Sequence, residues 1–180
     1  MENEQTQRPV GHLTSYYHPK KDDLVIGIID RKMLDDWLVD IGSSHCAYLP
    51  GLAFDGATKK NCPVFDRGEL IIAFIEEVPE AGEVLLNCVA RTPNEKLGRL
   101  SGGSILRLRP EDMNKVGSLQ IAQLVSTKTS LTMAKGENGR MWLDTGKPIS
   151  TIQLINSIKI ALQSEDPSHT FEDELQKISF

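Results

Sequence analysis

The sequence has few of the features that mark secreted, membrane or metal-binding proteins. Only 3 of its 180 residues are cysteines, and aromatic residues make up 6%. An odd number of cysteines without CxxC spacing argues against a disulfide framework or a zinc site and favours a reducing compartment. The longest uninterrupted apolar run, Leu70–Ile75, is far shorter than the roughly 20 residues that span a bilayer. The first residues are polar and acidic, unlike a signal peptide. We therefore expect neither a secreted nor a membrane protein.

Recognisable catalytic patterns are also missing. There is no GxSxG element and no phosphate-binding P-loop, and the 4 histidines share no metal-ligand spacing. Adjacent acidic residues in a strand point to opposite faces, so the acidic pairs do not converge as a two-metal nuclease site requires. The sequence therefore predicts a protein that is not an enzyme and has no metal and no cofactor. A hydrolytic nuclease is the competing hypothesis from another class.

Charge is segregated along the chain, whose formal net charge is −5. Residues 19–92 hold 8 basic and 13 acidic side chains, whereas residues 93–163 hold 10 basic and 5 acidic side chains. The last segment, 164–180, is acidic again. Because the local field rather than the net charge attracts a polyanion, the overall acidity does not exclude a nucleic-acid partner.

The first half of the chain has the pattern of a small barrel. Segments rich in β-branched and apolar residues predict five short strands, at 24–30, 36–41, 45–49, 69–78 and 83–90. Gly27 lies inside the first of them, as a bulge or tight bend in a barrel strand requires. The long connection 50–68 is expected to hold some helix over 54–59. This spacing favours an OB-fold over residues 19–92, preceded by a short N-terminal arm over residues 1–18.

The second half changes to a mixed pattern. A strand over 104–109 is followed by a helix that starts at Pro110–Asp112 and ends at Gly117, and by a second helix over 118–126. Two strands, 130–135 and 140–143, flank a tight Asn-Gly turn. The order β-α-α-β-β-α, completed by the helix described next, is that of a KH-like domain. We place this domain at residues 93–163, after a polar junction over 91–96.

A last helix is expected from Ser150, with Gln153 completing a capping box. Its predicted buried stripe consists of Ile152, Ile155, Ile158 and Leu162. The acidic C-terminal tail, residues 164–180, fits either a short amphipathic helix docked on a partner or a frayed end. The sequence does not decide between these two interpretations.

Several stretches occur in the order found in one family of proteins. They are Tyr17–Pro19, Asp23–Gly27, Val39–Gly42, Ala53–Pro63 and Gly136–Leu143. Over residues 16–162 the chain resembles the RNA exosome cap subunits of the ribosomal RNA-processing protein 40 (exosome component 3) family. The resemblance implies a mainly β plus α+β architecture, with an S1-type OB-fold five-stranded barrel followed by a KH-like domain. Its most specific part is Gly-Ala-Thr-Lys-Lys-Asn at residues 56–61.

The resemblance implies a non-catalytic, RNA-binding function. In that family, cap subunits stabilise a ring of proteins resembling RNase PH and guide RNA into its central pore for 3′–5′ processing, including rRNA processing, and degradation. The expected partners are therefore single-stranded RNA, the ring subunits and other cap subunits, with no membrane and no small-molecule cofactor. The expected location is the nucleus, including the nucleolus, and the cytoplasm. A free-standing RNA-binding regulator, such as a translation or mRNA-binding factor, is the alternative.

Three departures from the family pattern predict weaker contacts. The family's N-terminal domain is longer than the segment before residue 19, so we expect reduced or differently supplied ring contacts. Asp22-Asp23 stands where the family usually has Gly-Asp, and Cys62 stands where it often has arginine. Both changes remove positive potential from the barrel, which predicts weak independent RNA binding by this domain.

The candidate RNA contacts are cations and aromatic residues in and around the barrel. Lys59 and Lys60 come first, because a threaded strand must be held by phosphate contacts that do not depend on sequence. Tyr48 and Phe54 are candidates for stacking on bases, although a core position is favoured for Phe54. Arg91, just past the last predicted barrel strand, is a weaker candidate.

A glycine-rich turn is predicted to be structural. KH domains grip RNA with a GxxG loop between their first two helices, but that junction has a single glycine, Gly117. The Gly-Glu-Asn-Gly stretch instead lies between two strands, where Glu137 would repel phosphate. We therefore interpret Gly136, Asn138 and Gly139 as a structural turn at the barrel–KH interface, with Trp142 packed behind it.

Overall fold

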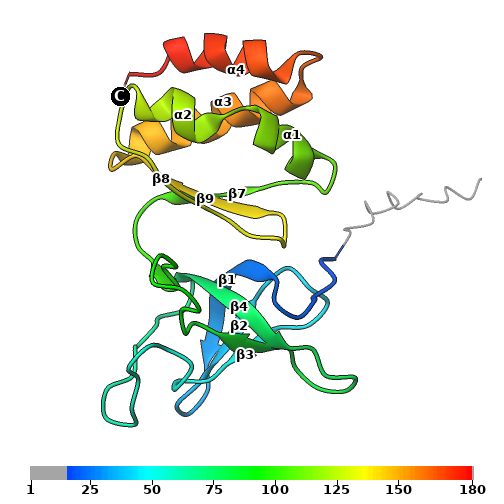
Figure 1. The fold of residues 1–180 in the computed structure, drawn as a ribbon, viewed down its shortest axis with the longest axis vertical. Coiled ribbons are helices and arrows are strands. Elements are labelled where there is room, and N and C mark those ends of the chain that lie inside the picture. Colours follow the sequence, from blue (N-terminus) through cyan, green and yellow to red (C-terminus); the bar gives the residue numbers. More distant parts are fainter. Residues whose placement is uncertain (1–15, 180) are drawn as a thin grey trace, which may run out of the picture.

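Residues 16–179 are described by a computed structural model, in which they form two units stacked on each other (Figure 1). Most of the expected arm, residues 1–15, lies outside the described residues. At its end, the Tyr17 amide donates to the Gly42 carbonyl at 3.0 Å, and the Tyr17 hydroxyl donates to Asp23. The described end of the arm is therefore attached to the barrel.

The first unit is a closed barrel of five strands. The strands β1 (Leu24–Lys32), β2 (Trp37–Asp40), β3 (Ala47–Leu49), β5 (Leu85–Asn87) and β4 (Leu70–Glu77) are neighbours in that order. Pairing of β1 with β4 closes the barrel, and β3 runs parallel to β5. This arrangement confirms the predicted S1-type OB-fold.

The barrel core follows from the alternation of side chains along its strands. Val25 and Ile29 of β1 are buried in it. Between them, a Cβ atom on Gly27 would lie 2.3 Å from Cγ1 of Val39, so a glycine is needed for the close approach of β1 and β2. Further core side chains come from the other strands and the long connection: Trp37, Val39, Ile41, Ala47, Leu49, Phe65, Ile71, Ala73, Ile75 and Leu86.

The connection between β3 and β4 contains turns and no helix. The predicted helix over 54–59 is wrong for two local reasons. Gly56 adopts a positive φ of 69°, and Thr58 forms an antiparallel backbone bridge with Asn61. The connection, drawn in cyan and teal, lies at the end of the barrel away from the second unit (Figure 1).

The barrel sheet extends beyond the boundary predicted at residue 92. The short strand β6 (Gly98–Leu100) pairs with the start of β4, after the polar segment 91–96 has been crossed. The chain passes to the second unit at Gly102 and Gly103, which both have positive φ. A strand of three residues has no readable periodicity, so the polar segment before it resembles a junction in the sequence.

The second unit has the predicted KH-like order of elements. These are β7 (Ser104–Arg107), α1 (Asp112–Ser118), α2 (Ile121–Ser126), β8 (Thr132–Lys135), β9 (Arg140–Asp144) and α3 (Pro148–Gln163). The strands form an antiparallel sheet in the order β7-β9-β8. The helices cover one face of it, and the other face is turned toward the barrel (Figure 1). Gly117 lies within α1 instead of ending it.

The start and the buried face of α3 differ from the prediction. The helix begins at Pro148, which suits a first helical position, and no side chain caps it. Ser150 is buried and donates to the Ser179 carbonyl at 3.1 Å, so the predicted capping box with Gln153 does not form. Ile152 is 52% exposed, because the helix turns Leu154 to the core in its place.

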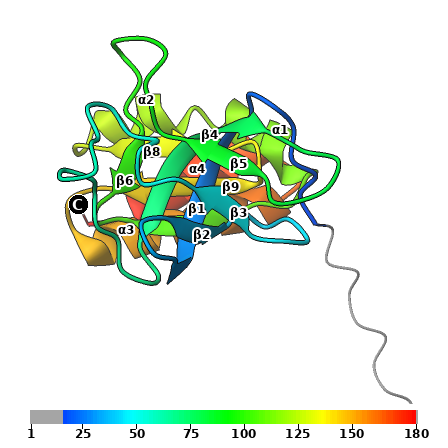
Figure 2. The same cartoon turned by 90° about the horizontal axis from the view of Figure 1, so that it is seen from below.

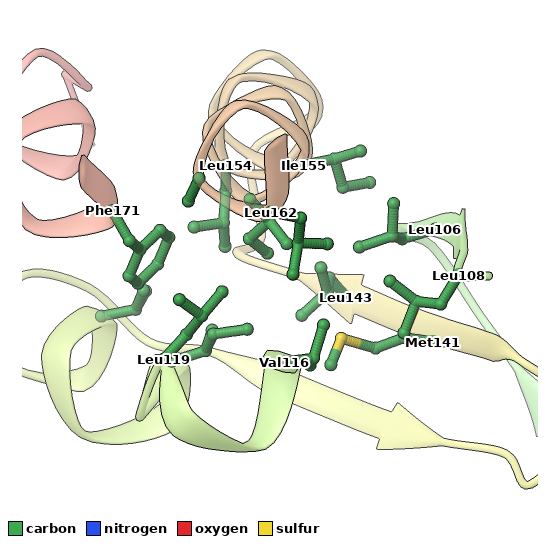
Figure 3. Close-up of a cluster of buried hydrophobic side chains, with 14 of the residues drawn as sticks. Leu106, Leu108, Val116, Leu119, Met141, Leu143, Leu154, Ile155, Leu162 and Phe171 are labelled. Atoms are coloured by element: carbon green, nitrogen blue, oxygen red, sulfur yellow. The ribbon is translucent and has the colours of Figure 1, made fainter. Parts of the chain in front are cut away.

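The acidic tail is part of the second unit rather than a separate segment. It forms α4 (Pro167–Gln176), where Asp166 caps the helix by accepting from the His169 amide at 3.2 Å. Phe171 and Leu175 are buried in the same core as α1, α2 and α3. Figure 3 shows the Phe171 ring directed from α4 toward Leu119 and Leu162. This packing favours the amphipathic-helix interpretation, with the docking surface supplied by the chain itself.

Within residues 16–179, no helix is long and apolar enough to cross a membrane. The same residues contain no group of three or more His, Cys, Asp or Glu side chains that could hold a metal ion.

Candidate nucleic-acid interface

The two lysines that rank first as RNA contacts occupy the tip of a tight turn. The Thr58 amide donates to the Asn61 carbonyl at 3.0 Å, and the Asn61 amide donates back at 2.9 Å. This pair of hydrogen bonds places Lys59 and Lys60 at the tip, where both are exposed. Neither has an acidic partner within 4.0 Å among residues 16–179. Both ammonium groups are therefore open to phosphate.

The base of this connection is attached to the barrel. The Cys88 amide donates to the Ala53 carbonyl at 2.8 Å, and the Ala90 amide donates to the Asp55 carboxylate at 3.2 Å. These bonds link the connection to the chain that follows β5. The Lys59–Lys60 turn is thus carried by a segment with defined geometry, which favours a fixed presentation of its two charges.

Phe54 is partly buried and packs against the barrel core. Its ring stacks on Phe65 with centroids 5.6 Å apart and meets the edge of Trp37 at 6.3 Å. Since one face of the ring is covered in this way, Phe54 stabilises the barrel. This is the core position that the sequence favoured over base stacking.

Tyr48 is held by an acidic neighbour. Its hydroxyl donates to the Asp36 carboxylate, which also accepts from the Gly51 amide at 2.8 Å. The hydrogen bond to Asp36 raises the pKa of Tyr48, with smaller contributions from burial and from Glu83. A ring flanked by carboxylates is a poor place for a phosphate-bearing strand.

Cys46 lies near charges of both signs on the neighbouring strands, those of Asp30, Asp40 and Arg31. Burial raises the pKa of the Cys46 thiol most, and the charges of Asp30 and Asp40 raise it further. OB-folds commonly bind oligonucleotides on the face of their second and third strands. In this barrel the Asp36 carboxylate beside Tyr48 makes that part of the face less favourable for phosphate than the exposed Lys59–Lys60 turn.

Arg91 is engaged with the barrel. Its guanidinium lies over the Phe74 ring, 4.2 Å from the centroid, and forms an ion pair with Asp22 at 2.6 Å. The side chain is still 46% exposed. The ion pair offsets the charge of Arg91, so its attraction for phosphate is weaker than that of an unpaired lysine.

The glycine-rich turn between β8 and β9 joins the two units. Asn138 is buried, and its side-chain amide forms hydrogen bonds with backbone groups of the barrel, as a peptide group in a neighbouring strand would. Its Oδ1 accepts from the Ile26 amide at 3.1 Å, and its Nδ2 donates to the carbonyls of Ile26 at 2.8 Å and Ile41 at 2.9 Å. A Cβ atom on Gly136 would lie 2.4 Å from Oδ1 of Asn138, so this close packing requires glycine. Gly139 has a positive φ of 70°.

Arg140 completes this contact and was missed from the sequence. Its side chain is 6% exposed, and its Nη2 pairs with the Asp40 carboxylate at 2.9 Å. Its Nη1 donates to the Ile26 carbonyl at 3.1 Å. No short sequence motif predicts that an arginine is buried when its hydrogen-bond partners lie in another domain. Trp142, two residues on, is buried behind the turn and donates to the Gly102 carbonyl at 3.0 Å.

The helix junction in the second unit lacks a phosphate clamp. Residues 117–120, which are the last two residues of α1 and the two that precede α2, contain one glycine, and Gln120 is the residue with positive φ there. A KH grip uses a GxxG loop at this place. Glu137, by contrast, lies in the turn that faces the barrel, where its amide donates to the Leu24 carbonyl at 2.7 Å.

Comparison with known proteins shows that the chain is similar to exosome components. The family described as "Exosome complex component RRP40, S1 domain" matches residues 17–98. Exosome complex component RRP40 of Drosophila melanogaster is 33% identical over 155 residues, which cover 82% of this chain and 65% of that protein. RRP40 of Homo sapiens is 30% identical over 152 residues, covering 79% and 54%.

A solved structure shares the fold of both units. It is a crystal structure described as that of an exosome complex RNA-binding protein, with a TM-score of 0.72 and 22% identity, and the match covers 91% of this chain and 97% of that one. The chain spans less than two thirds of the length of its first curated relatives. The resemblance predicted from the sequence is confirmed: residues 17–98 match the model of the RRP40 S1-domain family, and most of the chain is similar to RRP40 and Rrp4 exosome components.

Proposed function

We propose that this chain is a non-catalytic, RNA-binding cap subunit of an RNA exosome. The observation that carries the proposal is the exposed Lys59–Lys60 turn on an S1 barrel of the RRP40 family, without an acidic partner among residues 16–179. Two neighbouring ammonium groups attract phosphates without reading bases, as a strand that moves past them requires. In this function, the chain stabilises a ring of RNase PH-like subunits and guides single-stranded RNA into its pore.

The joined units suit a subunit that has to hold a fixed position. Asn138 and Arg140 connect the second unit to β1 and β2 of the barrel through buried hydrogen bonds. The connection that carries the Lys59–Lys60 turn, drawn in cyan and teal, lies at the end of the barrel away from the second unit (Figure 1). Docking through the second unit would therefore leave the two lysines free to face RNA. The proposed location is the nucleus, including the nucleolus, and the cytoplasm.

The test is the exchange of both lysines for alanine in the assembled complex. Lys59→Ala with Lys60→Ala should weaken capture of single-stranded RNA, and should lower the salt dependence of binding by about 0.7 for each phosphate that the variant no longer neutralises. Lys20→Ala with Lys21→Ala is the matched control, because it removes the same charge from another exposed pair. An unchanged salt slope in the first variant would contradict the proposed role of the turn.

The assembly itself separates this function from its alternatives. The tagged chain should elute from a size-exclusion column with other exosome proteins, whereas a free-standing regulator would elute as a small species. Incubation of the pure chain with single-stranded RNA, magnesium and manganese should leave the RNA intact. Cleavage that disappears when neighbouring acidic residues are changed to alanine would overturn the non-catalytic assignment.

A further inference from the structure

A cleft of about 550 Å³ lies at the end of β1, and the proposed RNA contacts do not include it. Its lining comes from two segments. The last residues of β1 supply Asp30, Arg31 and Lys32, and the end of the long connection supplies Phe65, Asp66 and Arg67. The Lys59–Lys60 turn belongs to the same connection as Arg67. Figure 2 views the molecule from the barrel end and shows β1 together with the loops that surround the barrel.

Backbone hydrogen bonds fix the two walls of this cleft. The Gly68 amide donates to the Ile29 carbonyl at 2.8 Å, and the Ile29 amide donates to the Glu69 carbonyl at 2.9 Å. Phe65 is 3% exposed and belongs to the barrel core. Its buried ring offers little surface for base stacking, so a ligand here would be recognised by the charged side chains.

Cations outnumber carboxylates in the cleft, and the arginines are only loosely paired. Arg31 and Arg67 share one carboxylate, that of Asp30, with nitrogen–oxygen distances of 3.4 Å each. Charge-assisted hydrogen bonds of full strength are shorter, about 2.7–2.9 Å. The arginine side chains are 66% and 81% exposed. Lys32 has no acidic partner within 4.0 Å among the described residues.

We propose that this cleft is a second phosphate-binding site for the single-stranded RNA held at the Lys59–Lys60 turn, with Arg31, Lys32 and Arg67 as its contacts. The inference rests on the proposed RNA-binding function and names a further part of the same surface. A guanidinium group can donate two parallel hydrogen bonds to the oxygens of one phosphate. Two exposed arginines around one cleft therefore indicate a site for phosphate. The strand would run from the turn to the cleft, on the side of the connection.

Binding of a fluorescein-labelled oligouridylate to the full purified chain, followed by fluorescence anisotropy at low salt, tests the site. Arg31→Ala with Arg67→Ala should weaken binding about tenfold and lower the salt slope by about 1.4, the value for two phosphate contacts on a single strand. Arg31→Lys with Arg67→Lys keeps the charge and should give an intermediate affinity. Far-UV circular dichroism checks that each variant is folded.

A gain of affinity gives the sharpest outcome, since a misfolded variant cannot produce it. Asp30→Asn releases both arginines from their shared carboxylate and should tighten binding about threefold. Glu80→Gln makes the same charge change at an exposed position in the β4–β5 loop and should change affinity much less. Equal effects of these two variants on affinity would overturn the site, because the change in the net charge of the chain would then account for both effects.

The outcomes separate the cleft from the proposed function. Normal binding by the Arg31→Ala, Arg67→Ala variant, together with weakened binding by the variant of Lys59 and Lys60, would overturn the cleft and leave the function standing. Absence of binding by the wild-type chain at low salt would overturn the cleft as a site of this chain, and the proposed function would still be decided by the test in the assembled complex. Weakened binding by both double variants, with a smaller salt slope in each, supports the cleft.

Discussion

Replacing Asn138 by alanine should loosen the contact between the barrel and the second unit. The side-chain amide of Asn138 is buried and bonds to the amide and carbonyl of Ile26 and to the carbonyl of Ile41. In the variant, the Ile26 amide and the Ile41 carbonyl lose these bonds, while the Ile26 carbonyl keeps Arg140. Each buried backbone group left without a partner costs about 1–3 kcal/mol.

The expected loss of stability is about 3 kcal/mol, because the two groups relax together and their costs are not fully additive. For a chain of this size that corresponds to a fall in melting temperature of roughly 6–12 °C. Asn94→Ala is the matched control, since Asn94 is exposed in the polar segment before β6. It should leave the melting temperature within about 1–2 °C of the wild type.

Denaturant unfolding followed by tryptophan fluorescence can assign the destabilisation to the contact between the units. Trp37 lies in the barrel and Trp142 in the second unit, so each unit can be followed with the other tryptophan changed to phenylalanine. In the wild type the two reporters should unfold together. In the Asn138→Ala variant their midpoints should separate, because the units are then less strongly coupled.

The variant Asn138→Asp tests whether the side-chain amide of Asn138 has the role assigned to it. It keeps an oxygen for the Ile26 amide but turns a carboxylate toward the carbonyls of Ile26 and Ile41. Asn138→Asp should therefore be less stable than Asn138→Ala at neutral pH. The deficit should shrink at low pH, where a protonated carboxyl can donate. A melting temperature equal to that of the wild type in either variant would refute the role assigned to this amide.

Three further outcomes are expected. Phe171→Ala should cost about 3–5 kcal/mol in unfolding free energy and detach α4, measured by denaturant titration and hydrogen exchange, whereas an unchanged stability would show that the tail is not part of the core. Cys88 should resist iodoacetamide in the native chain at pH 8 and react after unfolding, as read by mass spectrometry, because burial raises the pKa of its thiol to about 12. The bond to Asp36 raises the pKa of Tyr48, so its contribution to stability is complete below about pH 10 and disappears as the pH rises through the raised value. Tyr48→Phe should reduce this alkaline destabilisation, and identical pH profiles would contradict the bond.

Local patterns predicted most of the secondary structure, because the spacing of apolar residues along a segment differs between a strand and a helix. Five barrel strands and the β-α-α-β-β-α order could be read from the residues. Gly27 was expected to mark a bulge or bend, but it is needed for the close approach of Val39, and the register of β1 shifts between Ile29 and Arg31. Errors fell where the local signal is short or misleading. The strand β6 has three residues, and the segment 54–59 has helix-compatible residues but is bent at Gly56.

The candidate site divides in the same way. The residue types alone indicate its chemistry: a lysine pair in a loop, an Asn-Gly turn, and a family likeness carried by both. Which groups remain free depends on the folded chain, because pairing and burial involve residues that are distant in the sequence. Folding places Phe54 on Phe65, Tyr48 on Asp36 and Arg91 on Asp22, and it leaves Lys59 and Lys60 exposed. The partners of Arg140 lie about a hundred residues earlier, a separation at which no local pattern carries information about contact.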